Sequence, residues 1–449
     1  MAYKRSMFNV EIEELSDGRK LVYNTYSGIF GIMDKETQVI YNTIENLDVS
    51  SLDSDKMANV DIMHKSGYIV NTSKDELAAL KLERGRMRHP DDRLHLTIAP
   101  TMDCNMRCPY CFETRRDLVM SDEIQEQLIT FIKVHFDAYP KIKNLSVTWY
   151  GGEPLMQKEA IYHLSEKIIE LCAEKEIKYS AGMITNGALL DAKTAKHLVD
   201  DCKVSYVQIT IDGMKETHNK RRILANGEDS WDIITKNIEA CKDFLQISIR
   251  INIDKTNADE IKEFARYFLG EKGWTDNPSF YLAPIEEYSE ECLVSKSKCL
   301  EGGQFADINN EFMKATYAAN RNAVTRQFFP RRKVIFCSGE GMLHYVVDPE
   351  GYLSNCYVTV GVEENRTGHI SQPFVITSEY AKWMLTGIPE QCEKCEYLPM
   401  CMGGCGLHRV AGDGEPKCFK TFYTYKDILK LAYEDYIIQK SKKEMVTTT

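Results

Sequence analysis

The feature that most constrains this chain is a run of three cysteines, Cys104, Cys108 and Cys111, with the spacing C-x₃-C-x₂-C in TMDCNMRCPYCF. Four thiolates close an iron–sulfur cluster, so three would leave one iron of a [4Fe–4S] cube open to a small molecule. A zinc site and unrelated buried thiols are the alternatives. Structural zinc takes four ligands, and this loop has no fourth cysteine or histidine. The run therefore favours a cluster with an open iron.

A second group of cysteines in the last third of the chain sharpens this interpretation. Its spacing is C-x₁₃-G-x₄-C and then, after a gap, C-x₂-C-x₅-C-x₃-C-x₁₂-C, with Gly351 as the glycine. The first run resembles the motif of radical S-adenosylmethionine (SAM) enzymes, in which the open iron binds SAM. The second group is similar to the SPASM domain of peptide-modifying radical SAM enzymes. The resemblance spans about Leu94 to Cys418 and implies three [4Fe–4S] clusters and SAM as cofactors.

The resemblance also divides the second group between two auxiliary clusters. The outer cluster would have four ligands, which are Cys392, Cys395, Cys401 and Cys418. The inner cluster would have three, which are Cys337, Cys356 and Cys405. Fully ligated relatives carry one more cysteine shortly before the first SPASM cysteine, where this chain has QFFPRRKVIF. The fourth inner position is therefore open, and Cys292, Cys299 or a substrate thiolate is a candidate for it.

A glycine–carboxylate motif follows the second predicted strand. Gly151, Gly152 and Glu153 match the GGEP motif with which the family receives the amino group of SAM. Glycine lets a backbone approach a ligand closely, and a carboxylate satisfies an ammonium group. A simple turn is the alternative for such a motif in isolation, but its place one strand after the cysteine run favours SAM binding.

Polar residues at the ends of the next predicted strands are candidates for further SAM contacts. Gln208 and Thr210 lie two residues apart and so share one face of a strand. A buried glutamine needs polar partners, although a packed barrel layer is the alternative. By resemblance these two residues, together with Thr185 and Asn186, line the ribose and methionyl carboxylate of SAM.

Three further side chains complete the predicted SAM site. Arg222 and Arg250 are candidate partners for a carboxylate because guanidinium binds it in a bidentate fashion. For Arg222 a surface position is the alternative. By resemblance the stretch that contains Phe112 approaches the adenine of SAM, with ordinary packing as the alternative.

Length, charge and periodicity define the organisation. A chain of 449 residues suggests two or three domains. The middle alternates strand and helix patterns, which predicts a parallel α/β sheet in a partial (β/α)₆ barrel with chemistry at the carboxyl ends of its strands. The expected strands are 94–100, 145–150, 181–185, 204–211, 247–253 and 279–284, and the expected helices are 121–136, 159–175, 191–201 and 258–270.

Three domains are predicted: a winged-helix-like peptide-recognition domain at 1–90, the radical SAM barrel at 91–290 and a SPASM domain at 291–449. In the first we expect a strand–turn–strand at 21–33, helices at 35–47 and 76–87, and a strand within 64–71. A cap over the barrel is the alternative role. The charged stretch 82–93 is a candidate linker. The last third shows little periodicity, so cluster ligation is expected to hold it together.

Composition excludes some classes of function. The net charge of −11 argues against a general nucleic-acid binder. No apolar run approaches the ~20 residues that span a bilayer, and the start lacks the apolar stretch of a signal peptide. We therefore predict a cytoplasmic protein without nucleic-acid or membrane partners.

The resemblance implies that the enzyme installs thioether links between cysteine sulfur and carbon in a ribosomally made, cysteine-rich peptide. It would bind the peptide through a leader sequence added to a sheet edge and would take electrons from a flavodoxin- or ferredoxin-type donor. The alternatives are formylglycine formation, as in anaerobic sulfatase maturases, carbon–carbon cross-linking, epimerisation, and a non-enzymatic electron carrier. Sulfatase maturases place an acidic residue directly after the second SPASM cysteine, where this chain has Tyr357.

Overall fold

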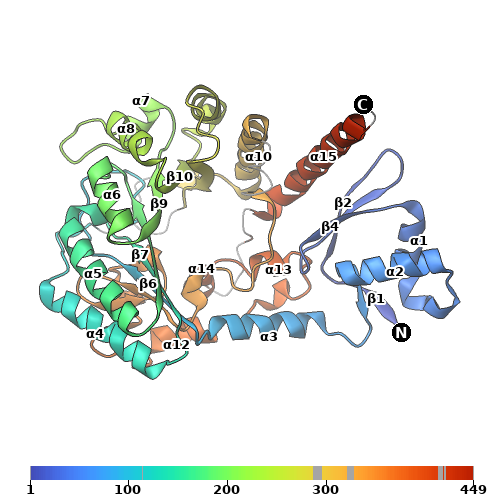
Figure 1. Cartoon of the computed structure of the whole chain (residues 1–449), viewed down its shortest axis with the longest axis horizontal. Helices are drawn as coiled ribbons and strands as arrows, with labels where there is room; N and C mark the ends of the chain where they lie inside the picture. The colour runs from blue at the N-terminus through green and yellow to red at the C-terminus, as the bar shows by residue number, and fades with distance from the viewer. Residues whose placement is uncertain are drawn as a thin grey trace. The chain divides into compact units, whose positions relative to one another are not determined.

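The computed structural model describes residues 2–113, 115–286, 296–320, 328–412, 418 and 421–447. The chain divides into two compact units, whose elements are labelled in Figure 1. The barrel unit comprises residues 89–320 and 338–385. The terminal unit comprises residues 1–88, 321–337 and 386–449. The division into three domains made from the sequence stays a prediction.

The barrel unit is built on a nine-stranded sheet in which six parallel strands follow chain order. Each strand from β6 to β11 pairs with the next one, and β12 then pairs in parallel with β6, followed by antiparallel β13 and β14. The strands are β6 (Arg93–Ile98), β7 (Asn144–Trp149), β8 (Lys178–Thr185), β9 (Val204–Thr210), β10 (Gln246–Ile253), β11 (Ser279–Pro284), β12 (His344–Val347), β13 (Tyr352–Ser354) and β14 (Gly368–His369). The predicted α/β fold is confirmed, with all six expected barrel strands in place.

Helices connect these strands and cover the outer face of the sheet, as α4, α5 and α6 show in Figure 1. Several of these helices begin at a capping residue that can be recognised in the sequence. For example, Ser121 caps α4 by accepting the Ile124 N–H at 3.3 Å. The helices of this unit are α4 (Asp122–Ala138), α5 (Lys158–Glu174), α6 (Ala192–Asp200), α7 (Lys215–Arg221), α8 (Trp231–Cys241), α9 (Ile261–Ala265), α10 (Gly302–Ala319) and α12 (Ser378–Leu385).

Alternate residues of strands such as β6, β7 and β10 form one apolar, buried face, and the residues between them are largely polar. In β6, Leu94, Leu96 and Ile98 are fully buried. They pair in register with Leu145, Val147 and Trp149 of β7. This packing fixes where each strand ends, and therefore which loop residues meet at the carboxyl edge of the sheet.

The terminal unit contains a three-stranded antiparallel sheet, a two-stranded sheet and several helices. Its first 88 residues form β1 (Tyr3–Arg5), β2 (Asn9–Glu14), β3 (Lys20–Asn24), β4 (Ile29–Met33), α1 (Lys35–Thr43), α2 (Ser54–Ser66), β5 (Ile69–Asn71) and α3 (Glu76–Arg88). Its last part forms α13 (Leu398–Cys401), α14 (Gly406–Ala411) and α15 (Thr421–Thr447). The predicted hairpin at 21–33 is present as β3 and β4.

Four local expectations differ from the structure. The candidate linker 82–93 is mostly helical, because α3 continues to Arg88. The expected helix 258–270 consists of a 3₁₀ turn, a short α-helix and a π-helix. The helix expected at 35–47 ends at Thr43 and continues as a 3₁₀ turn. The last third, expected to be largely irregular, contains the long helices α10 and α15.

Among the residues that the structure describes, no helix is both long enough and apolar enough to cross a membrane.

Candidate functional site

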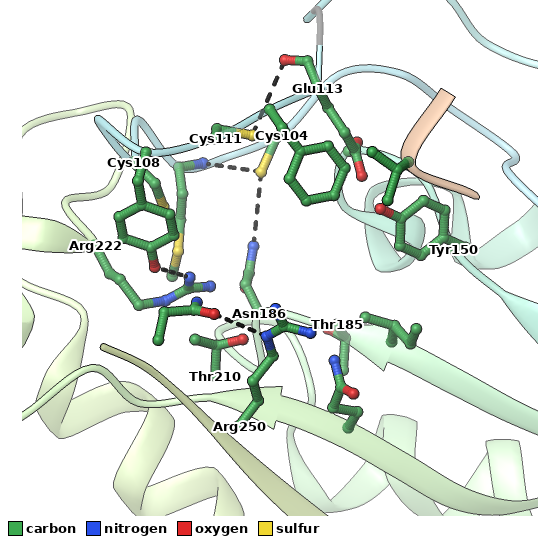
Figure 2. Close-up of a pocket in the computed structure, with 18 of the residues that line it drawn as sticks. Cys104, Cys108, Cys111, Glu113, Tyr150, Thr185, Asn186, Thr210, Arg222 and Arg250 are labelled. Atoms are coloured by element: carbon green, nitrogen blue, oxygen red, sulfur yellow. Dashed lines mark hydrogen bonds between the residues drawn. The ribbon is translucent and has the colours of Figure 1, made fainter. Parts of the chain in front are cut away.

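A pocket of about 250 Å³ lies in the barrel unit, where the loops after the parallel strands meet. Residues from the loop after β6, from the ends of β7 to β11 and from the segment after β13 line it. Figure 2 shows many of these side chains pointing toward one another. Of the residues predicted to bind SAM or the first cluster, the wall contains Cys104, Cys108, Cys111, Phe112, Gly151, Gly152, Thr185, Asn186, Gln208, Thr210, Arg222 and Arg250.

The three cysteines of the first run belong to the loop that follows β6. Burial raises the pKa of the Cys104 and Cys111 thiols to about 12, and it also raises the pKa of Cys108. Bare thiolates are therefore disfavoured here, whereas a bound metal deprotonates a thiol and supplies the missing charge. The Sγ of Cys104 also accepts hydrogen bonds from Met106 N at 3.4 Å and from Asn186 Nδ2 at 3.9 Å (Figure 2). These features fit thiolates on a cluster.

The three cysteines line a ligand-sized pocket. A four-iron cube holds its cysteine ligands at separate corners, so the thiolates need not meet at a point. The donor set of three cysteines around a ligand-sized pocket therefore fits a [4Fe–4S] cluster.

The GGEP motif holds the cysteine loop against the neighbouring strands. A Cβ on Gly152 would lie 2.2 Å from the carbonyl oxygen of Asp103, and one on Gly151 would lie 2.3 Å from that of Thr101. Gly151 also has a φ of +109°, a conformation that favours glycine. The close approach that the sequence suggested therefore includes contact with the cysteine loop itself.

Glu153 lies behind the pocket wall rather than in it. Its carboxylate is fully buried and accepts hydrogen bonds from Thr185 Oγ1 at 2.7 Å, Asn186 N at 2.7 Å and Leu155 N at 3.1 Å. Burial raises its pKa, and these hydrogen bonds oppose the rise. Glu153 therefore ties the ends of β7 and β8 together, and its contact with the amino group of SAM stays a prediction.

The far wall of the pocket is a network of polar side chains on β9, β10 and β11. Gln208 and Thr210 both line the pocket, as their spacing predicted. Tyr281 donates a hydrogen bond to Gln208 Oε1 at 2.5 Å, and Arg250 Nε donates to Asn252 Oδ1 at 2.7 Å. The partly buried Gln208 thus has a partner within the protein, and part of its polarity is satisfied before any ligand binds.

Arg222 is buried, not on the surface, with only 7% of its area exposed. Its Nη1 donates to the hydroxyl of Tyr110 at 2.7 Å. That hydroxyl in turn donates to the carboxylate of Asp212, which is fully buried. The surface alternative for Arg222 is therefore wrong, and its assignment to a SAM carboxylate stays a prediction.

Among the residues of the pocket wall that sequence reasoning missed are Glu113 and Tyr150. Burial raises the pKa of Glu113 to about 8, and Tyr150 hydrogen-bonds with it and opposes the shift. The Tyr150 ring lies edge-on to Tyr357, with centroids 5.3 Å apart. The sequence signal that could have identified Glu113 is its position two residues after Cys111, the last cysteine of the run.

The cysteines of the predicted outer cluster lie near one another within the terminal unit. Burial raises the pKa of Cys392, Cys395 and Cys401, and the charges of neighbouring cysteines in the set, including Cys418, raise it further. The charge of Arg409 opposes this rise at Cys392. The assignment of these four cysteines as ligands of the outer cluster stays a prediction.

The predicted inner set is divided between the two units. Cys337 and Cys405 belong to the terminal unit, whereas Cys356 follows β13 in the barrel unit. Cys299 is partly buried in the barrel unit, and Cys292 lies outside the described residues. The inner cluster and its fourth ligand stay predictions.

Comparisons with known proteins identify the domain that holds the pocket. Residues 98–268 match the Radical SAM superfamily. A cysteine-type anaerobic sulfatase-maturating enzyme of Clostridium perfringens (strain 13 / Type A) is 24% identical over 373 residues, which cover 76% of this chain and 96% of that enzyme.

Two solved structures share the fold. One is native anSMEcpe with bound AdoMet and the Cp18Cys peptide, with a TM-score of 0.59, 20% identity and coverage of 78% of this chain and 99% of that chain. The other is Streptococcus suis SuiB bound to the precursor peptide SuiA, with a TM-score of 0.52, 14% identity and coverage of 93% and 98%. At these identities the similarity supports the fold alone.

Residues 98–268 are therefore a radical SAM domain, and the chain is a radical SAM enzyme. The matched segment begins at the last residue of β6 and includes the three-cysteine run and GGEP. Such domains bind SAM and a [4Fe–4S] cluster, so the predicted enzyme class and these cofactors are confirmed.

Glu153→Gln should lower both the melting temperature and the affinity for SAM. Glutamine keeps the volume but turns one acceptor into an NH₂ group that faces the N–H of Asn186. Thr185→Val is the comparison variant, because it keeps the Glu153 carboxylate but removes the hydroxyl that donates to it at 2.7 Å and accepts from Gly187 N at 3.1 Å, each bond being worth about 1 kcal/mol. Anaerobic thermal unfolding and calorimetric titration with SAM measure both effects. Wild-type melting together with wild-type affinity in Glu153→Gln would contradict the role given to this carboxylate.

The double variant Cys392→Ala/Cys395→Ala should lose about four iron atoms per chain after anaerobic reconstitution, because one cluster loses half of its ligands. Cys172→Ala/Cys202→Ala is the control, since both of these thiols are buried in the barrel unit and belong to neither motif. Iron and sulfide analysis measures the loss. Equal iron in both double variants would show that the first pair binds no cluster.

Proposed function

We propose that this enzyme forms thioether links between cysteine sulfur and carbon in a ribosomally made, cysteine-rich peptide. The observation that carries this proposal is the identity of the residue after Cys356. Tyr357 lines the pocket there, with 42% of its area exposed. Formylglycine-forming relatives place an acidic base at this position, and a tyrosine does not supply a carboxylate.

The pocket residues have separate roles in this proposal. Cys104, Cys108 and Cys111 hold the cluster, and the strand-end residues Thr185, Asn186, Gln208 and Thr210 hold SAM, with Arg222 and Arg250 as partners for its carboxylate. When both are bound and the external donor has supplied one electron, they would generate the radical that removes a hydrogen atom from the substrate, and closure of the carbon–sulfur bond would release one electron to the auxiliary clusters. The wall of Phe112, Tyr150 and Ile285 excludes water and orients the substrate carbon.

The substrate sulfur is assigned to the inner cluster. Cys337, Cys356 and Cys405 provide three ligands, and a cysteine thiolate of the peptide takes the fourth position. A Lewis-acidic iron lowers the pKa of a bound thiol and so favours the thiolate at neutral pH. Tyr357 connects this position to the pocket, because it follows Cys356 directly and lines the pocket wall.

Peptide recognition is assigned to the first 90 residues of the chain. β4 pairs with β3 and forms one edge of the three-stranded sheet. Ile29 and Ile32 on this strand are more than one-third exposed. An extended leader peptide can add a strand to such an edge and place its apolar side chains against the isoleucines. A flavodoxin- or ferredoxin-type protein as electron donor and a cytoplasmic location complete the proposal.

Formylglycine formation is the second candidate. It is favoured by the sequence similarity to a cysteine-type sulfatase-maturating enzyme over 96% of that enzyme's length. The partly buried Glu113 provides a carboxyl group in the pocket wall that would act in place of the missing acid. The two reactions use the same radical but leave different products on the substrate cysteine.

Mass spectrometry of a cysteine-rich peptide encoded beside this gene separates the two reactions. With reconstituted enzyme, SAM and a reductant, we expect a loss of two hydrogens per modification and cysteines that no longer react with an alkylating agent. A peptide with each cysteine replaced by serine is the control and should stay unmodified. Loss of sulfur with gain of an aldehyde would assign the enzyme to formylglycine formation instead.

A further inference from the structure

The hydroxyl of Tyr110 lies at the centre of a buried charge network beside the cysteine run. It accepts a hydrogen bond from Arg222 Nη1 at 2.7 Å and donates one to Asp212, and the bond to Arg222 is drawn in Figure 2. The Asp212 carboxylate is held from its other side by the backbone N–H of Asn252 at 2.9 Å. The guanidinium of Arg221 lies 5.2 Å from the Tyr110 ring centroid. The hydroxyl is therefore fixed by several independent contacts.

This network faces the thiols that hold the cluster. Tyr110 stands between Cys108 and Cys111 in the chain, so its side chain lies on the loop that carries the thiols. Arg222 and the three cysteines line the same pocket, and Arg222 is hydrogen-bonded to the tyrosine that stands between two of them. Arg222 is thus a buried cation beside the thiols.

We infer that Tyr110 is a positioning residue whose hydroxyl holds the Arg222 guanidinium against the thiolates and thereby raises the reduction potential of the SAM cluster. Reduction adds one electron from a low-potential one-electron donor and makes or breaks no bond. The added negative charge is stabilised by a nearby fixed cation, and more strongly where water is excluded. Net charge and hydrogen bonds near the sulfurs are among the factors that set cluster potentials.

The inference uses the hydroxyl of Tyr110 and not its aromatic ring. Asp212 keeps its contact with Asn252 when the hydroxyl is removed, so the anion stays in place while the cation loses its anchor. Arg222 Nε has no hydrogen-bond partner among the residues that the structure describes, so no hydrogen bond within them restrains that end of the guanidinium. Loss of one oxygen atom should therefore make the local charge more negative and the cluster harder to reduce.

Tyr110→Phe in the reconstituted full-length enzyme tests this directly. EPR-monitored potentiometric titration gives the midpoint potential of the SAM cluster, after subtraction of spectra from a variant in which Cys104, Cys108 and Cys111 are all alanine. We expect a lower midpoint potential in Tyr110→Phe, with iron content and melting temperature close to wild type. Arg222→Lys, which keeps the positive charge, should shift the potential less than Arg222→Met.

An unchanged midpoint potential in Tyr110→Phe with full iron content would overturn the inference. If Tyr110→Phe fails to bind the cluster, the two Arg222 variants provide the test. The inference then requires a lower midpoint potential in Arg222→Met than in Arg222→Lys, and equal potentials would overturn it. This result does not depend on the proposed thioether reaction, since the titration contains no peptide and reads the cluster alone.

Discussion

The structure of the site depends on one constraint, the partial burial of three thiols at the carboxyl edge of a parallel sheet. Thiolates in that position need a positive partner, and a bound cluster supplies it. The surrounding residues hold the cysteine loop in this position. Gly151 and Gly152 let the cysteine loop approach the neighbouring backbone, and Glu153 ties that region to Thr185 and Asn186. The pocket is therefore a consequence of how this loop is held.

Much of this arrangement could be predicted from local sequence. Local patterns predicted the three cysteines, the GGEP motif and the pair Gln208 and Thr210. These residues line one pocket at the carboxyl end of the sheet, except that the carboxylate of Glu153 lies behind the pocket wall. The six barrel strands were recognisable because apolar runs such as ISIRINI alternate with helical patterns. Strand order then brought the strand-end residues together.

The remaining features of the fold and site could not be predicted from local sequence, because they depend on contacts between residues far apart in the chain. Arg222 looks like a surface residue in the run NKRRIL, and only the fold buries it beside Tyr110. Asp212 and Tyr110 are 102 residues apart, so no local pattern predicts their hydrogen bond. Helix α10 lacks strong charge patterning and lies among glycines and cysteines, which obscured its period. The stretch 82–93 reads as a charged linker because buried arginines such as Arg84 and Arg88 are uncommon.

The central claim is that Cys104, Cys108 and Cys111 hold a cluster that cleaves SAM in this pocket. Chromatographic detection of 5′-deoxyadenosine from SAM, under anaerobic conditions with a strong reductant, tests it most directly. The wild-type enzyme should form this product only when the reductant is present, and the variant with alanine at all three positions should form none. Equal product formation by that variant, or no product from fully iron-loaded wild-type enzyme, would contradict the claim.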